Sequence, residues 1–178
     1  MLQVGHAPVF VHPTKASEAI VEKQTAEEFG LALNSEVGVQ IDEIKNCTNP
    51  NNDFPDCEGL RHGNSVSIEL TELVRGHLRG KPNVRWKDKQ WNIDKFRDQM
   101  SCLIQKKIAK SRFHNVVLDY LVIHSNEEWI SPVQAEEWLS GLSFYAERRI
   151  HEAFFLQFYV PGWRDHWPIH KIALNNRA

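Results

Sequence analysis

This sequence has little of what marks secreted, membrane or zinc-finger proteins. Three cysteines among 178 residues form neither a disulfide framework nor the spacing of a zinc site. No apolar run approaches the length of a membrane span, and the first residues lack the basic start and apolar stretch of a signal peptide. We therefore expect a cytoplasmic protein with no membrane partner.

Two further absences narrow the choice of fold and function. The chain has no phosphate-binding glycine loop of the NTPase or dinucleotide type and no internal repeats. It has ample apolar bulk instead, with 42% hydrophobic residues, six Trp, nine Phe and three Tyr. This length and composition predict one globular domain over residues 1–178.

The order of the sequence patterns predicts an α/β fold with three layers, in which helices flank a central mixed sheet. A core of about residues 14–125 would be completed by helices and strands of 126–178. The aromatic C-terminal third would finish this core, and an exposed part of it would serve a homodimer. The expected helices cover 13–34 and 92–112 and begin again at Ser131-Pro132, and the expected strands cover 37–41, 54–60, 65–74, 116–123, 153–160 and 169–174.

The net charge of −2 hides an uneven distribution of charge. Residues 75–112 contain twelve Lys or Arg and three Asp, a net charge of +9 against −11 for the rest of the chain. Clustered basic residues are typical of surfaces that bind nucleic-acid phosphates, although a solvated helix and loop would give the same pattern. The candidate contacts to DNA or RNA are Arg75, Arg79, Lys81, Arg85, Lys87, Lys89, Lys106 and Lys110.

Two acidic residues fall opposite each other in a predicted hairpin. If His62-Gly63 forms a two-residue turn, Asp56 lies directly across from Glu69, with β-carbons about 4.5–5.5 Å apart. Opposed carboxylates repel each other, and a divalent cation removes that repulsion. Mg²⁺, or Mn²⁺, held by Asp56 and Glu69 could polarise a phosphate and activate a water. The alternative is a solvated polar face with the two acids splayed apart.

The predicted helix from Asn92 carries a lysine on its apolar face. At about 100° per residue, Lys107 falls in the middle of the apolar stripe. Such a lysine either extends past the core to solvent or meets a buried anion. An ammonium aimed at the paired carboxylates could orient a water or stabilise charge on phosphate. The stripe itself consists of Ile93, Phe96, Met100, Leu103 and Ile104.

With Pro55-Asp56 on one strand and Glu69-Leu70-Thr71 on the next, the sequence resembles the PD-(D/E)xK nuclease superfamily of restriction-endonuclease-like fold. The resemblance covers about residues 14–125. The lysine of that motif is Thr71 here, and Lys107 is the candidate for a lysine that has moved to the following helix. Members often carry a further acid on the first helix, for which Glu18 and Glu22 are the candidates.

The resemblance implies metal-dependent hydrolysis of phosphodiester bonds in DNA or RNA. Asp56 and Glu69 would bind the cation and Lys107 would act with them as the third catalytic group. The alternative is a catalytically inactive nucleic-acid-binding or accessory module on the same fold. A hydrolase of small substrates is a third hypothesis, which predicts a deep apolar pocket at the carboxylates.

Overall fold

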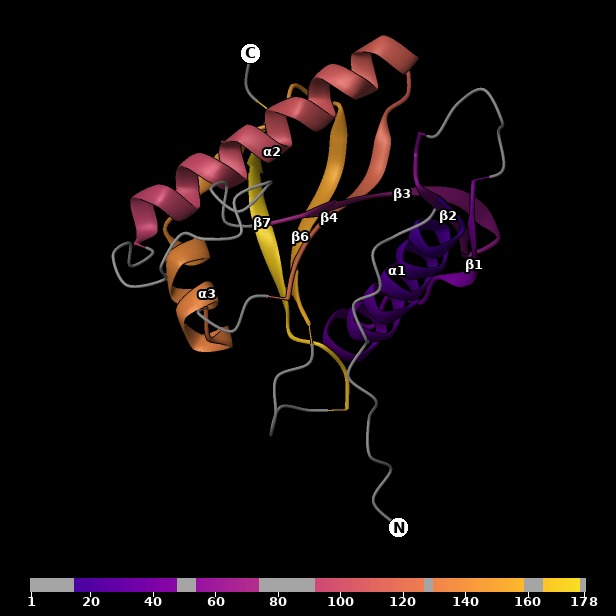
Figure 1. Ribbon diagram of the computed structural model, residues 1–178, viewed down its shortest axis with the longest axis horizontal. Helices are drawn as coiled ribbons and strands as arrows, with labels where there is room; N and C mark the ends of the chain where they lie inside the picture. The colour runs from indigo at the N-terminus through magenta and orange to yellow at the C-terminus, as the bar shows by residue number, and fades with distance from the viewer. Residues whose placement is uncertain (1–14, 48–53, 74–91, 127–129, 159–164, 177–178) are drawn as a thin grey trace.

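The computed structural model describes residues 15–47, 54–73, 92–126, 130–158 and 165–176. These residues form an α/β structure in which helices lie against a seven-stranded mixed sheet (Figure 1). No helix within these ranges is long and apolar enough to cross a membrane. The elements in chain order are α1 (Lys15–Val37), β1 (Asp42–Asn46), β2 (Cys57–Arg61), β3 (Asn64–Glu72), α2 (Ile93–His114), β4 (Leu118–Ser125), α3 (Pro132–Ser140), β5 (Ser143–Tyr145), β6 (Ile150–Gln157) and β7 (Ile169–Asn175).

The sheet has an antiparallel edge at β1 and β2, a parallel centre, and a parallel pair of β7 and β5 at the other edge. The strand order is β1-β2-β3-β4-β6-β7-β5. Strands β3, β4 and β6 run parallel, whereas β1, β2 and β3 form an antiparallel meander. The helix α2 lies in the chain between the parallel strands β3 and β4, as a crossover connection requires. The side chains of α2 are therefore brought onto the sheet beside β3.

The core has one cluster on each face of the sheet. On one face α1 packs through Phe29 and Leu33 against the sheet, and on the other α2 packs through Phe96 and Met100. The central strand β4 supplies side chains to both clusters, alternately from Tyr120 to Ile123, as expected for an apolar strand covered on both sides. Its members are Tyr120 and Val122 in the α1 cluster and Leu118, Leu121 and Ile123 in the α2 cluster.

Local sequence signals set the ends of α2 and the start of α3. The side chain of Asn92 accepts a hydrogen bond from Lys95 N at 3.0 Å, and Asn115 closes α2 in the left-handed region at φ 53°. Ser131 caps α3 by accepting from Gln134 N at 3.2 Å, with Pro132 in the first turn. The capped start predicted at Ser131-Pro132 is confirmed.

Two features near the ends of the sheet differ from the sequence prediction. The strand expected over 37–41 is absent, because Val37 ends α1 and Gly38 follows at φ 73° with its N–H bonded to Asn34 O. The alternating apolar residues there belong to the helix end and its link to β1. The three-residue strand β5 was not predicted, because it is too short to show a periodic pattern.

Candidate functional site

The hairpin of β2 and β3 sets the position of the acidic residues. Its turn is His62-Gly63, with φ of 51° and 77°, the positive values that a two-residue turn with both central residues left-handed requires. Cys57 pairs with Ile68, which is the register that the sequence predicts. One position further along, Asp56 lies opposite Glu69.

The two faces of this hairpin separate apolar from polar side chains. The apolar side chains belong to the cluster under α1, whereas Glu69 points to the face that α2 covers. Period-two alternation fixes this separation once the register is set. The members on the α1 face are Cys57, Val66, Ile68 and Leu70.

Asp56 and Glu69 are held together by reciprocal hydrogen bonds. Asp56 N donates to Glu69 Oε2 at 3.1 Å, and Leu70 N donates to Asp56 Oδ2 at 2.7 Å. Each carboxylate thus accepts from the backbone of the opposite strand, where the regular ladder ends. The acids face each other rather than splaying into solvent, which decides between the two readings of the hairpin.

Two lysines of α2 reach the same carboxylate. Lys107 Nζ lies 2.5 Å from Glu69 Oε1 and 2.7 Å from Leu70 O, and Lys110 Nζ lies 3.3 Å from Glu69 Oε1. The Lys107 side chain is only 16% exposed, so it meets a buried anion instead of extending to solvent. The structure therefore brings Asp56, Glu69 and Lys107 into one cluster.

Lys110 has a closer role than the sequence suggested. Sequence reasoning placed it among candidate phosphate contacts, but its ammonium touches Glu69 and lies 4.7 Å from the centre of the Phe54 ring. Its spacing of three residues from Lys107 puts both lysines on one side of a helix. That spacing was the available signal, and the missing information was how close α2 approaches β3.

Glu69 is fully buried, and its environment changes its acidity. Burial and the Asp56 carboxylate raise the pKa of Glu69 to about 7, and the two lysine ammonium groups oppose that rise. Two cations do not offset the loss of solvent together with a second acid. The cluster therefore favours additional positive charge at neutral pH.

The structure distinguishes between the two acids considered on α1. Glu22 is half-buried, and its pKa is raised by burial first and then by Asp56 and Glu18. Lys107 and Lys110 act in the opposite direction on Glu22. Glu22 thus lies within electrostatic range of Asp56, Lys107 and Lys110, whereas Glu18 is exposed one turn earlier. Glu22 is the better candidate for the additional acid.

The donor atoms of the cluster suit a hard divalent cation. The Lys107 ammonium already bridges Glu69 Oε1 and Leu70 O, so these oxygens are arranged around a positive charge. Together with Asp56 they form an all-oxygen set, which is the preference of Mg²⁺ and Mn²⁺. Within the described ranges no group of three or more His, Cys, Asp or Glu is arranged to hold a metal. Water and a substrate phosphate would have to complete the coordination.

Of the other predicted site residues, the structure describes only some. Thr71 is partly exposed two positions after Glu69 on β3, and Lys106 is exposed on α2 next to Lys107. The remaining candidate phosphate contacts lie outside the described residues, and these are Arg75, Arg79, Lys81, Arg85, Lys87 and Lys89.

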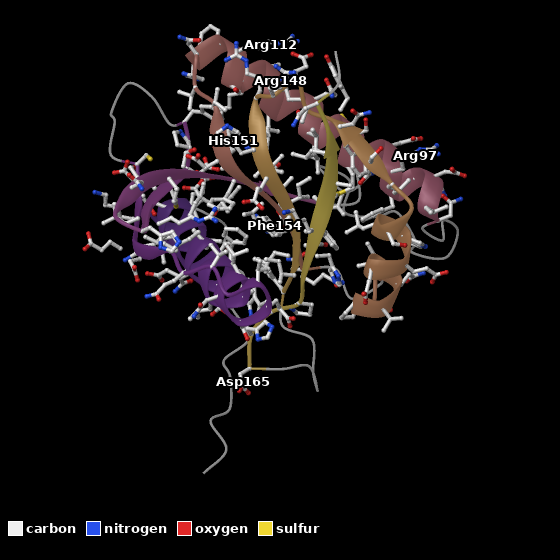
Figure 2. The ribbon with its side chains drawn as sticks, turned by 180° about the vertical axis from the view of Figure 1, so that it is seen from behind. Arg97, Arg112, Arg148, His151, Phe154 and Asp165 are labelled. Atoms are coloured by element: carbon white, nitrogen blue, oxygen red, sulfur yellow. The ribbon has the colours of Figure 1, made fainter. Side chains whose placement is uncertain are left out.

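A row of polar side chains crosses the sheet beside the cluster, and the alternation of β2 and β3 predicts only its members Glu58 and Ser67. Lys45 pairs with Glu58 at 3.2 Å, and Glu58 lies opposite Ser67. Ser67 Oγ donates to Asp119 Oδ2 at 2.9 Å, and Asp119 Oδ1 lies 3.3 Å from His151 Nδ1. Figure 2 shows His151 in the same half of the molecule as Arg112, which belongs to the last turn of α2. Sequence reasoning overlooked the rest of this row because Asp119 lies within an otherwise apolar strand.

The raised pKa of Glu69 predicts how stability depends on pH without divalent cations. The folded protein binds the Glu69 proton more tightly than the unfolded chain, so this stabilisation is complete below pH 4.5 and is lost as the pH rises through about 7. The loss is on the order of 3 kcal/mol, from about 1.4 kcal/mol per pKa unit. We expect urea unfolding in EDTA to show a larger fall in free energy from pH 5 to pH 8 for the wild type than for Glu69→Gln.

The matched control for this comparison is Glu27→Gln, on the exposed side of α1. It should keep the wild-type dependence on pH, because the Glu27 side chain is half-exposed and forms a surface ion pair with Lys23. Equal pH dependence in the wild type and Glu69→Gln would contradict the assignment of the raised pKa to Glu69.

A hollow of about 660 Å³ lies elsewhere, beside α3 and β7. Its lining includes Leu139, His170 and Ile172 but none of the residues of the carboxylate–lysine cluster. A small-substrate hydrolase requires an apolar pocket at the carboxylates. This hollow lies elsewhere and does not provide it.

Comparison of the chain with protein-family models, with curated proteins and with solved structures gives no match. Any functional conclusion therefore depends on the geometry of the cluster.

Proposed function

We propose that this chain is a metal-dependent nuclease that hydrolyses phosphodiester bonds, built on a restriction-endonuclease-like core. The observation that carries the proposal is the contact of Lys107 with Glu69, opposite Asp56. Two acids and a lysine are the three groups of the PD-(D/E)xK motif, and here a lysine from α2 supplies the group that Thr71 lacks.

The order of elements supports the finer fold. A helix, a three-stranded meander, a crossover helix and a parallel strand follow each other from α1 to β4. This is the order expected for the core of about residues 14–125. The cluster lies between the meander and the crossover helix, which is the expected place for the motif.

Each group has a role that its contacts support. Asp56 and Glu69 present facing carboxylates and Leu70 presents a carbonyl oxygen, so together they would hold Mg²⁺ or Mn²⁺. The bound cation supplies charge stabilisation at a phosphate and lowers the pKa of a water. Once a cation replaces its contacts to Glu69 and Leu70, the Lys107 ammonium would orient that water or stabilise the phosphate charge. Lys110 and the exposed Lys106 would hold the nucleic-acid backbone.

The proposal is tested by a cleavage assay on purified full-length protein. Single- and double-stranded DNA and RNA of mixed sequence are incubated with Mg²⁺, with Mn²⁺ or with EDTA. We expect cleavage of at least one substrate with Mg²⁺ or Mn²⁺ and none with EDTA, because the carboxylates act through the cation.

Three results would change the conclusion in different ways. Binding of nucleic acid without cleavage under any cation would support the inactive module on the same fold. If the protein neither binds nor cleaves any of these substrates, nucleic acid is excluded as the substrate class. Cleavage that persists in EDTA would contradict the role given to Asp56 and Glu69.

A further inference from the structure

Phe113 is an aromatic side chain without a place in the core. It lies in the last turn of α2 and is 86% exposed. A phenylalanine so exposed is not explained by packing, because it buries almost none of its apolar surface. The exposure of this ring therefore needs an explanation other than core packing.

The ring of Phe113 is supported next to the carboxylate–lysine cluster. Phe113 meets the neighbouring His114 ring edge to face, with centroids 5.0 Å apart, and His114 stacks on Phe54 at 5.2 Å. Phe54 is buried and precedes Asp56 by two residues. A chain of three rings thus connects the exposed Phe113 with the segment that carries Asp56, just before β2.

Phe113 also lies on the same flank of α2 as Lys106 and Lys110. At about 100° per residue, Lys106, Lys110 and Phe113 fall within about 60° of one another around the helix. Phe113 lies one turn beyond Lys110, a rise of about 4.5 Å along the axis. Lys110 itself contacts Glu69. The exposed Phe113 ring and the two lysines therefore lie on one flank of the helix, and Lys110 connects this flank with Glu69 on β3.

A positively charged surface with an exposed aromatic ring is the combination that binds single-stranded nucleic acid. The lysines contact the backbone, and the ring stacks on a base that is free of its partner. A base paired inside a duplex cannot offer its face to a side chain in this way. The flank therefore favours a strand with an unpaired base.

We infer that Phe113 is a stacking platform for an unpaired base next to the scissile phosphate. The proposed substrate is accordingly single-stranded nucleic acid or a locally unpaired strand. This inference rests on the proposed nuclease function and adds the substrate class to it. Phe113 would position the strand and has no part in the bond cleavage itself.

The test measures binding of the full-length protein to fluorescent oligonucleotides in EDTA, where cleavage is not expected. The ligands are single-stranded DNA and RNA and the matched duplexes. We expect Phe113→Ala to weaken single-strand binding about 5- to 100-fold, the usual effect of removing one stacked base. Duplex binding should change less than twofold, and Phe113→Trp should retain or strengthen single-strand binding.

Abasic oligonucleotides provide the second arm of the test. One base is removed at successive positions of the single strand, which keeps the phosphates intact. At the stacked position the wild type and Phe113→Ala should bind equally, because the base that the ring contacts is gone. The matched control is Tyr145→Ala, another exposed aromatic residue, in β5 at the far edge of the sheet, and it should bind as the wild type does.

The other outcomes separate a failure of the stacking role from a failure of the nuclease proposal. Single-strand binding that Phe113→Ala leaves unchanged, or an equal loss on single strands and duplexes, removes the stacking role while the nuclease proposal stands. A change in oligomeric state of Phe113→Ala by light scattering would instead assign the ring to an interface between two copies. Absence of nucleic-acid binding by the wild type overturns both. Binding together with a lack of wild-type cleavage by Mg²⁺ or Mn²⁺ overturns only the nuclease proposal.

Discussion

Asp56→Asn should lower the Mg²⁺-dependent cleavage rate at least about 10³-fold. The cation is expected to contribute several kcal/mol to transition-state stabilisation, and Asn removes one of the two carboxylates that would hold it. The amide keeps an oxygen to accept from Leu70 N, as Asp56 Oδ2 does at 2.7 Å. The fold should therefore survive, and the free energy of unfolding in EDTA should change by less than about 1 kcal/mol.

Measuring both the cleavage rate and the stability distinguishes loss of a cation ligand from loss of the folded structure. The matched control is Asp94→Asn, an exposed acid in the first turn of α2, which should keep the wild-type rate. In the wild type, added Mg²⁺ should also raise the melting temperature, because the cation binds the folded state, and in Asp56→Asn this rise should be lost. A cleavage rate within tenfold of the wild type would exclude Asp56 as a ligand of the cation.

Lys107→Met should lower the cleavage rate about 10²- to 10³-fold, the usual effect of removing one charged group from a transition state. Methionine is of similar length and keeps the helix packing, but it removes the ammonium that contacts Glu69 and Leu70. Lys107 is among the groups that lower the pKa of Glu69, so its loss should raise that pKa further. The pH profile of the remaining activity should therefore move to higher pH, which a purely structural role would not produce.

Two further variants make the Lys107 prediction specific. Lys106→Met, on the exposed neighbouring position, should raise KM and weaken the salt dependence of binding with little change in kcat. Thr71→Lys added to Lys107→Met should recover part of the lost rate, because it returns the ammonium to the strand that carries Glu69. If Lys107→Met cleaves like the wild type, Lys107 only neutralises Glu69.

The sequence was informative where short-range geometry decides the structure. The turn His62-Gly63 and the alternation on both strands sufficed to place Asp56 opposite Glu69, because a two-residue turn fixes the register. The helical projection sufficed to place Lys107 on the buried side of α2. Both inferences needed only the period of one element and no knowledge of its neighbours.

The sequence could not supply what depends on how elements pack together. Ile93 falls on the apolar stripe of α2 in projection, yet it is 41% exposed, because it is the first residue of the helix. Glu18 and Glu22 differ by one helical turn, and only the approach of α1 to Asp56 distinguishes them. The contact of Lys110 with Glu69 similarly depends on how α2 crosses the sheet. The oxygen of Leu70 carries no side-chain signature at all.

The supply of the lysine by α2 instead of by β3 has a consequence for distant mutations. A lysine on β3 would move together with Glu69. Lys107 instead keeps its contact with Glu69 only as long as α2 keeps its packed position on the sheet. Ile104 and Ile108 flank Lys107 on the helix and are fully buried in that packed position. A change there that shifts the helix by a fraction of an ångström alters the distance between ammonium and carboxylate. Under the proposed function, the cleavage rate would then fall with such a change before the melting temperature does.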